Sequence, residues 1–221
     1  MSLQAKVRCL MLVSSVTAAL LVSCTGKVRY PDYYKLAVAP TKQPPVTTVP
    51  SNVTVAVRRF ETPGYVRQGR IVYRETPERV GFYEYHRWAS DPGVAVTTAV
   101  IDSLRASGRF SSVTPYDGQE HSDYVLDGRI EKLEEVDYKS TVSVEVELSA
   151  SLVNARTGAA IWSGSVAKTA DVGSRDMNSV VSAMTEAADD GIEQLVTNMQ
   201  SSLLRTASLP ENTLSAGAGV Q

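Results

Sequence analysis

A strict alternation of apolar and polar residues over residues 142–152 restricts the fold of this chain more than any other feature. Val, Leu or Ala occupies every second position, and Ser or Glu occupies the positions between them. Six such alternations in succession predict a β-strand, because successive side chains of a strand point to opposite sides. One face of this strand must be buried, so the chain needs other elements that cover it.

The same period of two predicts further strands on both sides of this segment. Residues 124–131 alternate in the same way, and a hairpin turn at residues 154–158 leads into a returning strand over residues 160–172. Apolar and aromatic runs predict five earlier strands, at residues 33–39, 52–60, 70–75, 80–88 and 113–115.

Two segments show the spacing of helices with one apolar face. The first begins at Asp91-Pro92, where Asp is a preferred N-cap and Pro fits the first turn, and it ends at Gly108. Its expected buried stripe is Val94, Thr97, Ile101 and Leu104. The second runs from about residue 176 to 205, with the stripe Met177, Val180, Val181, Met184, Ala188, Leu195, Met199 and Leu203.

This order of strands and helices predicts an α+β domain in which two principal helices pack on a mainly antiparallel sheet. The helices can bury their apolar stripes on the apolar face of the sheet. The pattern leaves open whether the two halves of the chain form one sheet or two.

The N-terminal residues 1–23 have the features of a bacterial lipoprotein signal peptide. A basic start, Lys6 and Arg8, precedes 13 uncharged residues, a run too short to cross a bilayer as a helix. The run ends in Leu21-Val22-Ser23-Cys24, which supplies the aliphatic residue, the small residue and the cysteine that lipoprotein signal peptidase needs. An ordinary signal peptide with a chance cysteine would not require these features together, so we expect Cys24 to carry the lipid.

This assignment divides the chain into a signal peptide, a tether over residues 24–32, one domain over residues 33–205 and a disordered tail over residues 206–221. The other cysteine, Cys9, leaves with the signal peptide, so the mature chain can form no internal disulfide and no cysteine-based zinc site. Without Lys6 and Arg8, 20 of the 22 basic residues remain against 24 acidic residues. A net charge of about −4 is not typical of a general polyanion binder.

Residues suited to catalysis are few. His121-Ser122-Asp123 contains the residue types of a catalytic triad, but adjacent side chains diverge and cannot form the relay. His86 has no other histidine or cysteine at metal-site spacing, so we expect a packed or surface histidine. Glu134-Glu135 resembles a carboxylate pair, but neighbouring strand residues point to opposite faces, which favours the solvated end of a strand. We therefore expect no enzyme activity, no metal ion and no cofactor.

The segment from residue 58 to 88 is unusually rich in arginine and aromatic residues. It contains seven arginines and no lysine: Arg58, Arg59, Arg67, Arg70, Arg74, Arg79 and Arg87. Seven aromatic residues lie among them: Phe60, Tyr65, Tyr73, Phe82, Tyr83, Tyr85 and Trp88. Two interpretations stay open. Such residues are common at protein–protein contacts, but the pattern also fits an amphipathic hairpin with aromatics in the core and arginines in water.

Several stretches of the chain together match one known family. They are the cysteine motif at Cys24, Tyr33-Tyr34-Lys35-Leu36, Arg70-Ile71-Val72-Tyr73-Arg74, Val80-Gly81-Phe82-Tyr83-Glu84-Tyr85-His86-Arg87-Trp88-Ala89 with Asp91-Pro92, Leu104-Arg105-Ala106-Ser107-Gly108-Arg109-Phe110, and Asp123-Tyr124-Val125-Leu126-Asp127-Gly128. On these residues the chain resembles the ABC-type transport auxiliary lipoproteins, the family of paraquat-inducible protein C. The resemblance covers most of residues 33–200.

The resemblance implies a role rather than a reaction. Members of this family accompany ABC transporters whose substrate-binding component carries a mammalian-cell-entry (MCE) domain, and these systems are associated with moving lipids between the inner and outer membranes. It implies that residues 33–205 form the auxiliary lipoprotein domain, that the partner is the MCE-domain protein, and that the chain faces the periplasm. It is compatible with a homo-oligomer. The export signal argues against a nucleic-acid partner.

The membrane and the contact residues are also expectations at this point. Thr25 follows the cysteine, where an aspartate would retain a lipoprotein in the inner membrane, so we expect the outer membrane. The candidate contact residues for the partner lie in the arginine-rich and aromatic segment: Arg70, Tyr73, Arg74, Tyr83, Tyr85, Arg87 and Trp88.

Other functions remain as alternatives. The chain could itself bind a lipid or another hydrophobic ligand in a groove, which would require an interior cavity lined by the alternating valines. It could also be a cell-envelope assembly factor. A cell-envelope enzyme would need a cluster of polar residues in a pocket, which the sequence gives no reason to expect.

Overall fold

The computed structural model describes residues 28–39, 51–118, 122–137 and 141–207. The predicted signal peptide, Cys24, His121 and the chain after residue 207 lie outside the described residues. The chain divides into two compact units, Met1–Pro31 and Asp32–Gln221. The fold described below is that of the second unit.

Eight strands and three helices are present in the described residues. The strands are β1 (Asp32–Tyr34), β2 (Ser51–Val57), β3 (Arg70–Thr76), β4 (Arg79–Trp88), β5 (Phe110–Pro115), β6 (Tyr124–Val136), β7 (Ser143–Asn154) and β8 (Ala160–Asp171). The helices are α2 (Gly64–Arg67), α3 (Pro92–Ala106) and α4 (Met177–Ala207). The expected α+β class, with two principal helices on a mainly antiparallel sheet, is confirmed.

The strands form one sheet, which answers the question that the sequence left open. β6 is its organising strand, since β7 pairs antiparallel along one edge of β6 for almost its whole length. β2 and β3 both pair parallel with β6, β2 near the start of β6 and β3 at its end. β4 then pairs with β3, β1 with β4, β5 with β2 and β8 with β7. Four of these pairs are parallel but short, so most paired residues lie in the antiparallel pairs β3–β4, β6–β7 and β7–β8. The period of two predicted the strands but not these parallel pairs.

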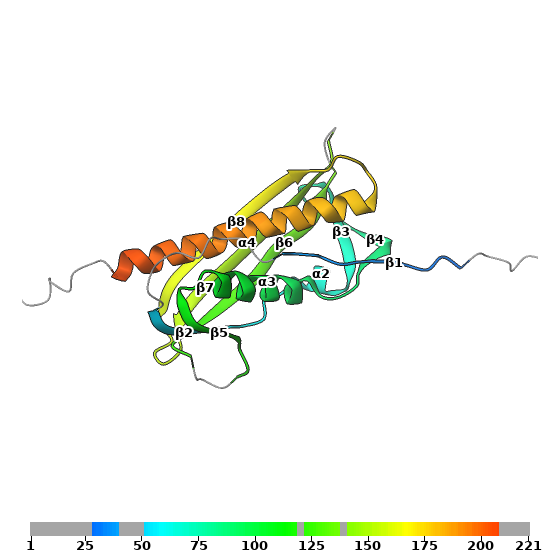
Figure 1. Ribbon diagram of the computed structural model, residues 1–221. Coiled ribbons are helices and arrows are strands. Elements are labelled where there is room, and N and C mark those ends of the chain that lie inside the picture. Colours follow the sequence, from blue (N-terminus) through cyan, green and yellow to red (C-terminus); the bar gives the residue numbers. More distant parts are fainter. Residues whose placement is uncertain (1–27, 40–50, 119–121, 138–140, 208–221) are drawn as a thin grey trace, which may run out of the picture. The chain divides into compact units, whose positions relative to one another are not determined.

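The alternating strand is β7, and its apolar face is buried as expected. Its residues Val144, Val146, Leu148, Ala150 and Leu152 are between 0 and 7% exposed. α4 packs on β7 and β8 and lies across the sheet in Figure 1. The predicted stripe of α4 is buried from Met177 to Met199, and Leu203 is partly buried. No helix in the described chain combines the length and hydropathy that a membrane span requires.

The limits of α3 agree with the predicted helix, but its buried stripe differs. The Asp91 side chain accepts a hydrogen bond from the Gly93 N–H at 2.8 Å, as an N-cap does. Val94 is 45% exposed, whereas Val96 and Val100 are buried, so the predicted position of Val94 in the stripe is wrong. Val94 lies about 120° around the helix axis from Val100, which is at the centre of the buried stripe. Thr97, also placed in the predicted stripe, accepts a hydrogen bond from the Phe60 N–H at 2.9 Å.

The first strand is shorter than the predicted residues 33–39, and the motif around it has a structural role. β1 ends at Tyr34, and Leu36 beyond it is 4% exposed and belongs to the hydrophobic core. β1 lies parallel to the end of β4, with Tyr33 opposite Arg87. The chain therefore enters the domain by covering the end of the β3–β4 hairpin.

Candidate functional site

All seven candidate contact residues lie on the β3–β4 hairpin, residues 70–88. This hairpin joins the sheet through few backbone pairs, because β3 meets β6 only at Tyr73 opposite Glu135 and Arg74 opposite Val136. Side chains on both faces of β6 supply the remaining polar contacts. They include Glu134 and Glu135, for which the sequence predicts a solvated strand end.

Glu134 is fully buried, so the prediction of a solvated strand end is wrong for this residue. Arg74 donates from Nε to Oε1 at 2.7 Å and from Nη2 to Oε2 at 2.8 Å, a two-bond contact between a guanidinium and a carboxylate. A third donor of Arg74 reaches the Pro77 carbonyl oxygen at 2.6 Å, which ties the pair to the hairpin turn. The prediction fails because β3 continues alongside the end of β6 and covers it.

Glu135 is also buried, at 4% exposure, and it points to the other face of β6. The Tyr83 hydroxyl donates to its Oε2 at 2.9 Å. Burial raises the pKa of Glu135 above its ordinary value, although the hydrogen bond from Tyr83 opposes this. Burial and the nearby Glu135 carboxylate raise the pKa of Tyr83 as well. The expected alternation of the two glutamates is correct, whereas their exposure to water was not.

A row of rings extends this contact toward β1. The Tyr73 ring lies over Gly81, where an added Cβ would overlap it, and its centroid is 4.8 Å from that of Tyr83. His86 stands edge-on to Tyr83 at 5.5 Å and forms a 3.0 Å hydrogen bond through Nδ1 with the Tyr34 hydroxyl. His86 is thus a packed histidine.

The arginines of the segment fall into two groups. Arg58 pairs with Asp127, Arg59 with Asp91, Arg74 with Glu134 and Arg79 with Glu75, while Arg67 donates to the Thr62 carbonyl oxygen. Arg70 and Arg87 form no ion pair with any described residue. Trp88 is 4% exposed and belongs to the core. The interpretation as an amphipathic hairpin with packed aromatic residues therefore fits Tyr73, Tyr83 and Trp88. Arg70, Tyr85 and Arg87 are half-buried and lie nearer the surface.

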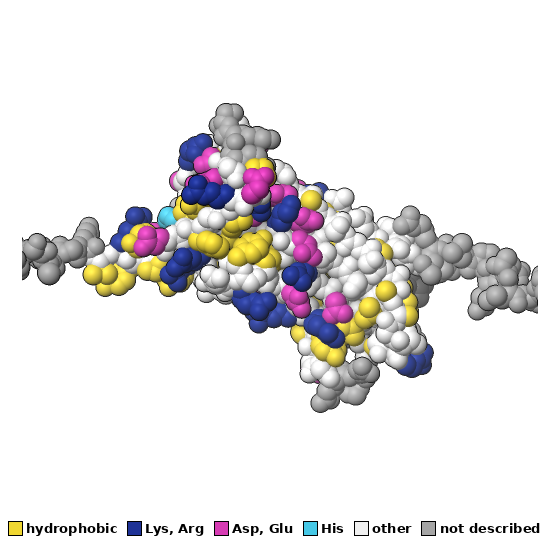
Figure 2. All heavy atoms as spheres, turned by 180° about the vertical axis from the view of Figure 1, so that it is seen from behind, with side chains coloured by type: hydrophobic (Ala, Val, Ile, Leu, Met, Phe, Trp, Pro, Cys, Tyr) yellow, Lys and Arg dark blue, Asp and Glu magenta, His cyan; other side chains and the backbone are white. Residues whose placement is uncertain are grey.

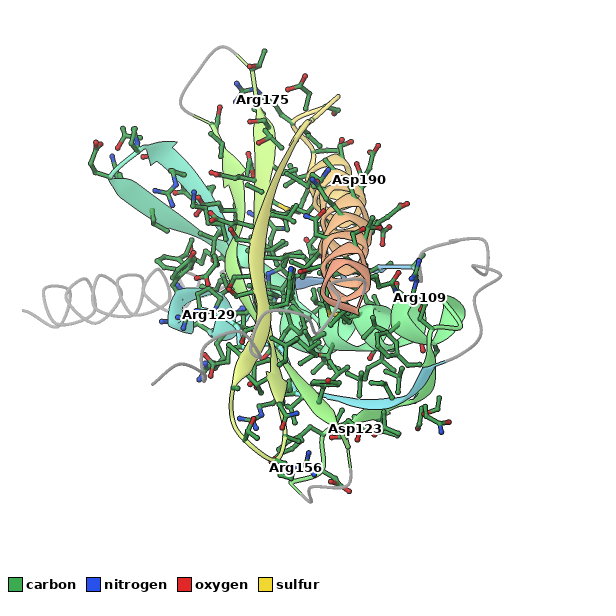
Figure 3. All side chains as sticks on the ribbon, turned by 90° about the vertical axis from the view of Figure 1, so that its left-hand side faces the viewer. Arg109, Asp123, Arg129, Arg156, Arg175 and Asp190 are labelled. Atoms are coloured by element: carbon green, nitrogen blue, oxygen red, sulfur yellow. The ribbon has the colours of Figure 1, made fainter. Side chains whose placement is uncertain are left out.

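A polar groove of about 630 Å³ lies on the sheet face that α4 leaves uncovered. Its lining combines charged residues with small residues of β6, β7 and β8: Arg58, Arg59, Glu61, Asp127, Gly128, Arg129, Ser149, Ala150, Ser151, Ser163, Gly164 and Ser165. Figure 3 shows Arg129 and α4 on opposite sides of the sheet, and Figure 2 shows a stripe of acidic and basic side chains beside an area of uncharged surface. This groove does not have the lining that the lipid-binding alternative requires, since the alternating valines lie buried on the other face.

Asp123 of the triad-like segment has a structural role. Asp123 accepts hydrogen bonds from the Thr54 N–H and hydroxyl, both at 2.8 Å, and so fastens β2 to the start of β6. Within the described ranges, no three His, Cys, Asp or Glu side chains gather as metal ligands would.

The sequence model of the ABC-type transport auxiliary lipoprotein component family matches residues 34–206. The chain belongs to this family. The matched range contains β3, β4 and β6 with the two buried pairs that join them. Membership makes this auxiliary lipoprotein a component of ABC-type transport that is held at a membrane of the cell envelope. Among curated proteins, none matches the chain.

Solved structures share the fold of this auxiliary lipoprotein. The crystal structure of protein XCC0632 from Xanthomonas campestris aligns with a TM-score of 0.70 at 20% identity, over 80% of this chain and 99% of that one. The hypothetical protein CT253 from Chlamydia trachomatis aligns with a TM-score of 0.50 at 10% identity, over 70% of this chain and 99% of that one. At such identities the likeness concerns the fold alone.

Proposed function

We propose that this lipoprotein is anchored through Cys24 in the outer membrane, faces the periplasm and assists an MCE-type ABC system that moves lipids between the two membranes. The observation that carries the proposal is the family match over residues 34–206. The cysteine motif that ends at Cys24 and the Thr25 that follows it support the anchor and the membrane.

The proposed role is contact with the transporter rather than binding of the transported lipid. The apolar face of β7 is covered by α4, and the groove on the other face is lined by charged and small polar side chains. Acyl chains favour apolar surroundings, so neither face offers them a site. The lipoprotein therefore acts through its surface.

The tip and open edge of the β3–β4 hairpin are the proposed contact with the MCE protein. β4 pairs with β3 on one side, and on the other side β1 covers only residues 86–88. Residues 79–84 thus form an edge that pairs with no other strand of the described chain, and such an edge can pair with a strand of another protein. Val80 on this stretch is 36% exposed. Arg74 and Tyr83 fix the position of the hairpin on β6, because they bind the buried Glu134 and Glu135, respectively.

Purification of the tagged full chain from detergent-solubilised membranes tests the function. We expect the MCE protein, a permease and an ATPase to co-purify, and palmitate to label the wild type but not Cys24→Ala. Val80→Asp should weaken the complex by about 2 kcal/mol, roughly thirtyfold. Val94→Asp is the matched control, since Val94 is exposed on α3, outside the hairpin. A complex without an MCE protein, or equal loss in both variants, would contradict the proposal.

A further inference from the structure

Three side chains form a row across the end of the sheet. Tyr33 on β1 is directly opposite Arg87 on β4, and Arg87 is directly opposite Arg70 on β3. Side chains at directly opposite positions point to the same face of a sheet. The Trp88 N–H donates to the Gly69 carbonyl oxygen at 2.7 Å, which makes Arg70 and Arg87 a non-hydrogen-bonded pair, the kind whose side chains lie closest together.

This row concentrates positive charge without an acid to balance it. Neither Arg70 nor Arg87 has a carboxylate within 4.0 Å in the described part of the chain, although most arginines of the segment do. The Nε of Arg87 is buried and has no hydrogen-bond acceptor among the described residues. Like charges directly opposite each other destabilise a sheet, and a buried donor without an acceptor adds to that cost. One anion held between the two guanidiniums would remove both costs.

The position of the row in the chain identifies the kind of anion. Tyr33 is 63% exposed and follows Cys24 by nine residues, which span at most about 30 Å when fully extended. The segment before it exposes Val28 at 69% and Tyr30 at 78%. Exposed tyrosines beside basic residues are typical of protein surfaces at the headgroup level of a bilayer. The nearest abundant anion to this row is thus a lipid phosphate.

We propose that Tyr33, Arg87 and Arg70 bind the phosphate of an anionic phospholipid headgroup in the bilayer that anchors Cys24. Arg70 and Arg87 hold the phosphate oxygens, and the Tyr33 ring lies among the headgroups. This contact rests on the anchoring part of the proposed function. It fixes the β1 end of the sheet against the membrane, so the lipid anchor and the protein surface together orient the domain.

The purified, acylated chain in vesicles without any transporter provides the test. A dye on Lys35→Cys reports the β1 end, and a dye on Thr114→Cys in β5 is the control, because β1 and β5 lie at opposite ends of the strand order and both positions are exposed. We expect headgroup-attached spin labels to quench the dye at position 35 and not at 114 when phosphatidylglycerol is added to phosphatidylcholine. Arg70→Ala or Arg87→Ala should each lower the ratio of docked to undocked domains about fivefold. Arg79→Ala, at the far end of the hairpin, should not.

Several outcomes would overturn the lipid assignment. Equal quenching at positions 35 and 114, or unchanged quenching in both arginine variants with wild-type circular dichroism, would remove the proposed contact. Loss of quenching at position 35 when millimolar inorganic phosphate is added would indicate a site for soluble phosphate instead of a lipid headgroup. If Arg70→Ala or Arg87→Ala kept full quenching but lost the MCE protein in the separate co-purification, the row would be assigned to a protein partner. Because no transporter is present, a failure here leaves co-purification of the transporter as a separate test of function.

Discussion

Replacing Arg74 by alanine would remove the only cation that contacts the buried Glu134 carboxylate in the described structure. Glu134 is 0% exposed at its side chain, and the Arg74 side chain that covers it is 20% exposed. Two hydrogen bonds of 2.7 and 2.8 Å join the two groups. The variant would leave a carboxylate without its partner beneath the hairpin.

The expected loss follows from this geometry. Removing one partner of a buried ion pair costs about 3–5 kcal/mol, because the remaining charge is neither hydrated nor paired. Water can enter where the partly exposed Arg74 side chain was, so we expect the lower end, about 3 kcal/mol. With a urea dependence of about 2 kcal/mol per molar, the unfolding midpoint should fall by roughly 1.5 M. Removing both charges in Arg74→Met/Glu134→Leu should cost far less, because apolar residues of similar size leave no charge unpaired.

Urea unfolding followed by circular dichroism measures both values. Arg79→Ala is the control, since Arg79 pairs with Glu75 but its side chain is 75% exposed, and exposed pairs contribute at most about 1 kcal/mol. If Arg74→Ala destabilised the domain no more than Arg79→Ala, the buried pair would not hold the hairpin. The same conclusion would follow if the double variant lost as much stability as the single one.

Three further outcomes are expected. Gly128→Ala should cost about 1–3 kcal/mol in urea unfolding, because its Cβ would overlap the buried Phe60 ring, whereas Gly64→Ala, which meets nothing within 4 Å, should be neutral. Hydrogen bonds from Ser179 lower the pKa of Asp176 to about 2, so Asp176→Ala should lower the melting temperature at neutral pH, and the difference should fade as the pH falls from 3.8 to about 2. Burial raises the pKa of Glu135 above 4.5, so ionisation of Glu135 lowers the stability of the wild type as the pH rises from 4.5 through the raised pKa. The free energy of unfolding of Glu135→Gln, relative to the wild type, should therefore be higher at neutral pH than below pH 4.5.

The elements of this fold could be predicted from sequence because their signals are local. The alternation in β7, the Asp91-Pro92 start of α3 and the apolar stripe of α4 all depend on a few neighbouring residues. Strand direction is not local, since a period of two is the same in parallel and antiparallel pairs. The parallel pairs of β6 with β2 and β3 therefore became visible only in the structure.

The burial of the two glutamates depends on what covers each face of β6, which the alternation alone does not show, and the phase of β6 also changes within the strand. The pairing of β6 with β7 shifts between Ile130 and Lys132, a one-residue irregularity that turns every later side chain to the other face. Leu133 and Glu135 then point to the face of Val146 and Val144, and Glu134 points away from it. Leu133 is apolar and 1% exposed, although it is out of phase with Ile130. In the sequence, this apolar residue was the sign that the end of the strand is buried.

The two glutamates explain how a hairpin with two backbone pairs to β6 can keep one orientation. A short parallel ladder resists separation of the strands but does little against rotation about the strand axis. Arg74 reaches Glu134 on one face of β6, while Tyr83 reaches Glu135 on the other. Rotation in either direction must stretch one of these contacts, and each ends in a buried carboxylate that has few alternatives. The hairpin can thus present its open edge at one end and the Arg70–Arg87 row at the other in a fixed relation, which the two proposed contacts, with a transporter and with a membrane, both require.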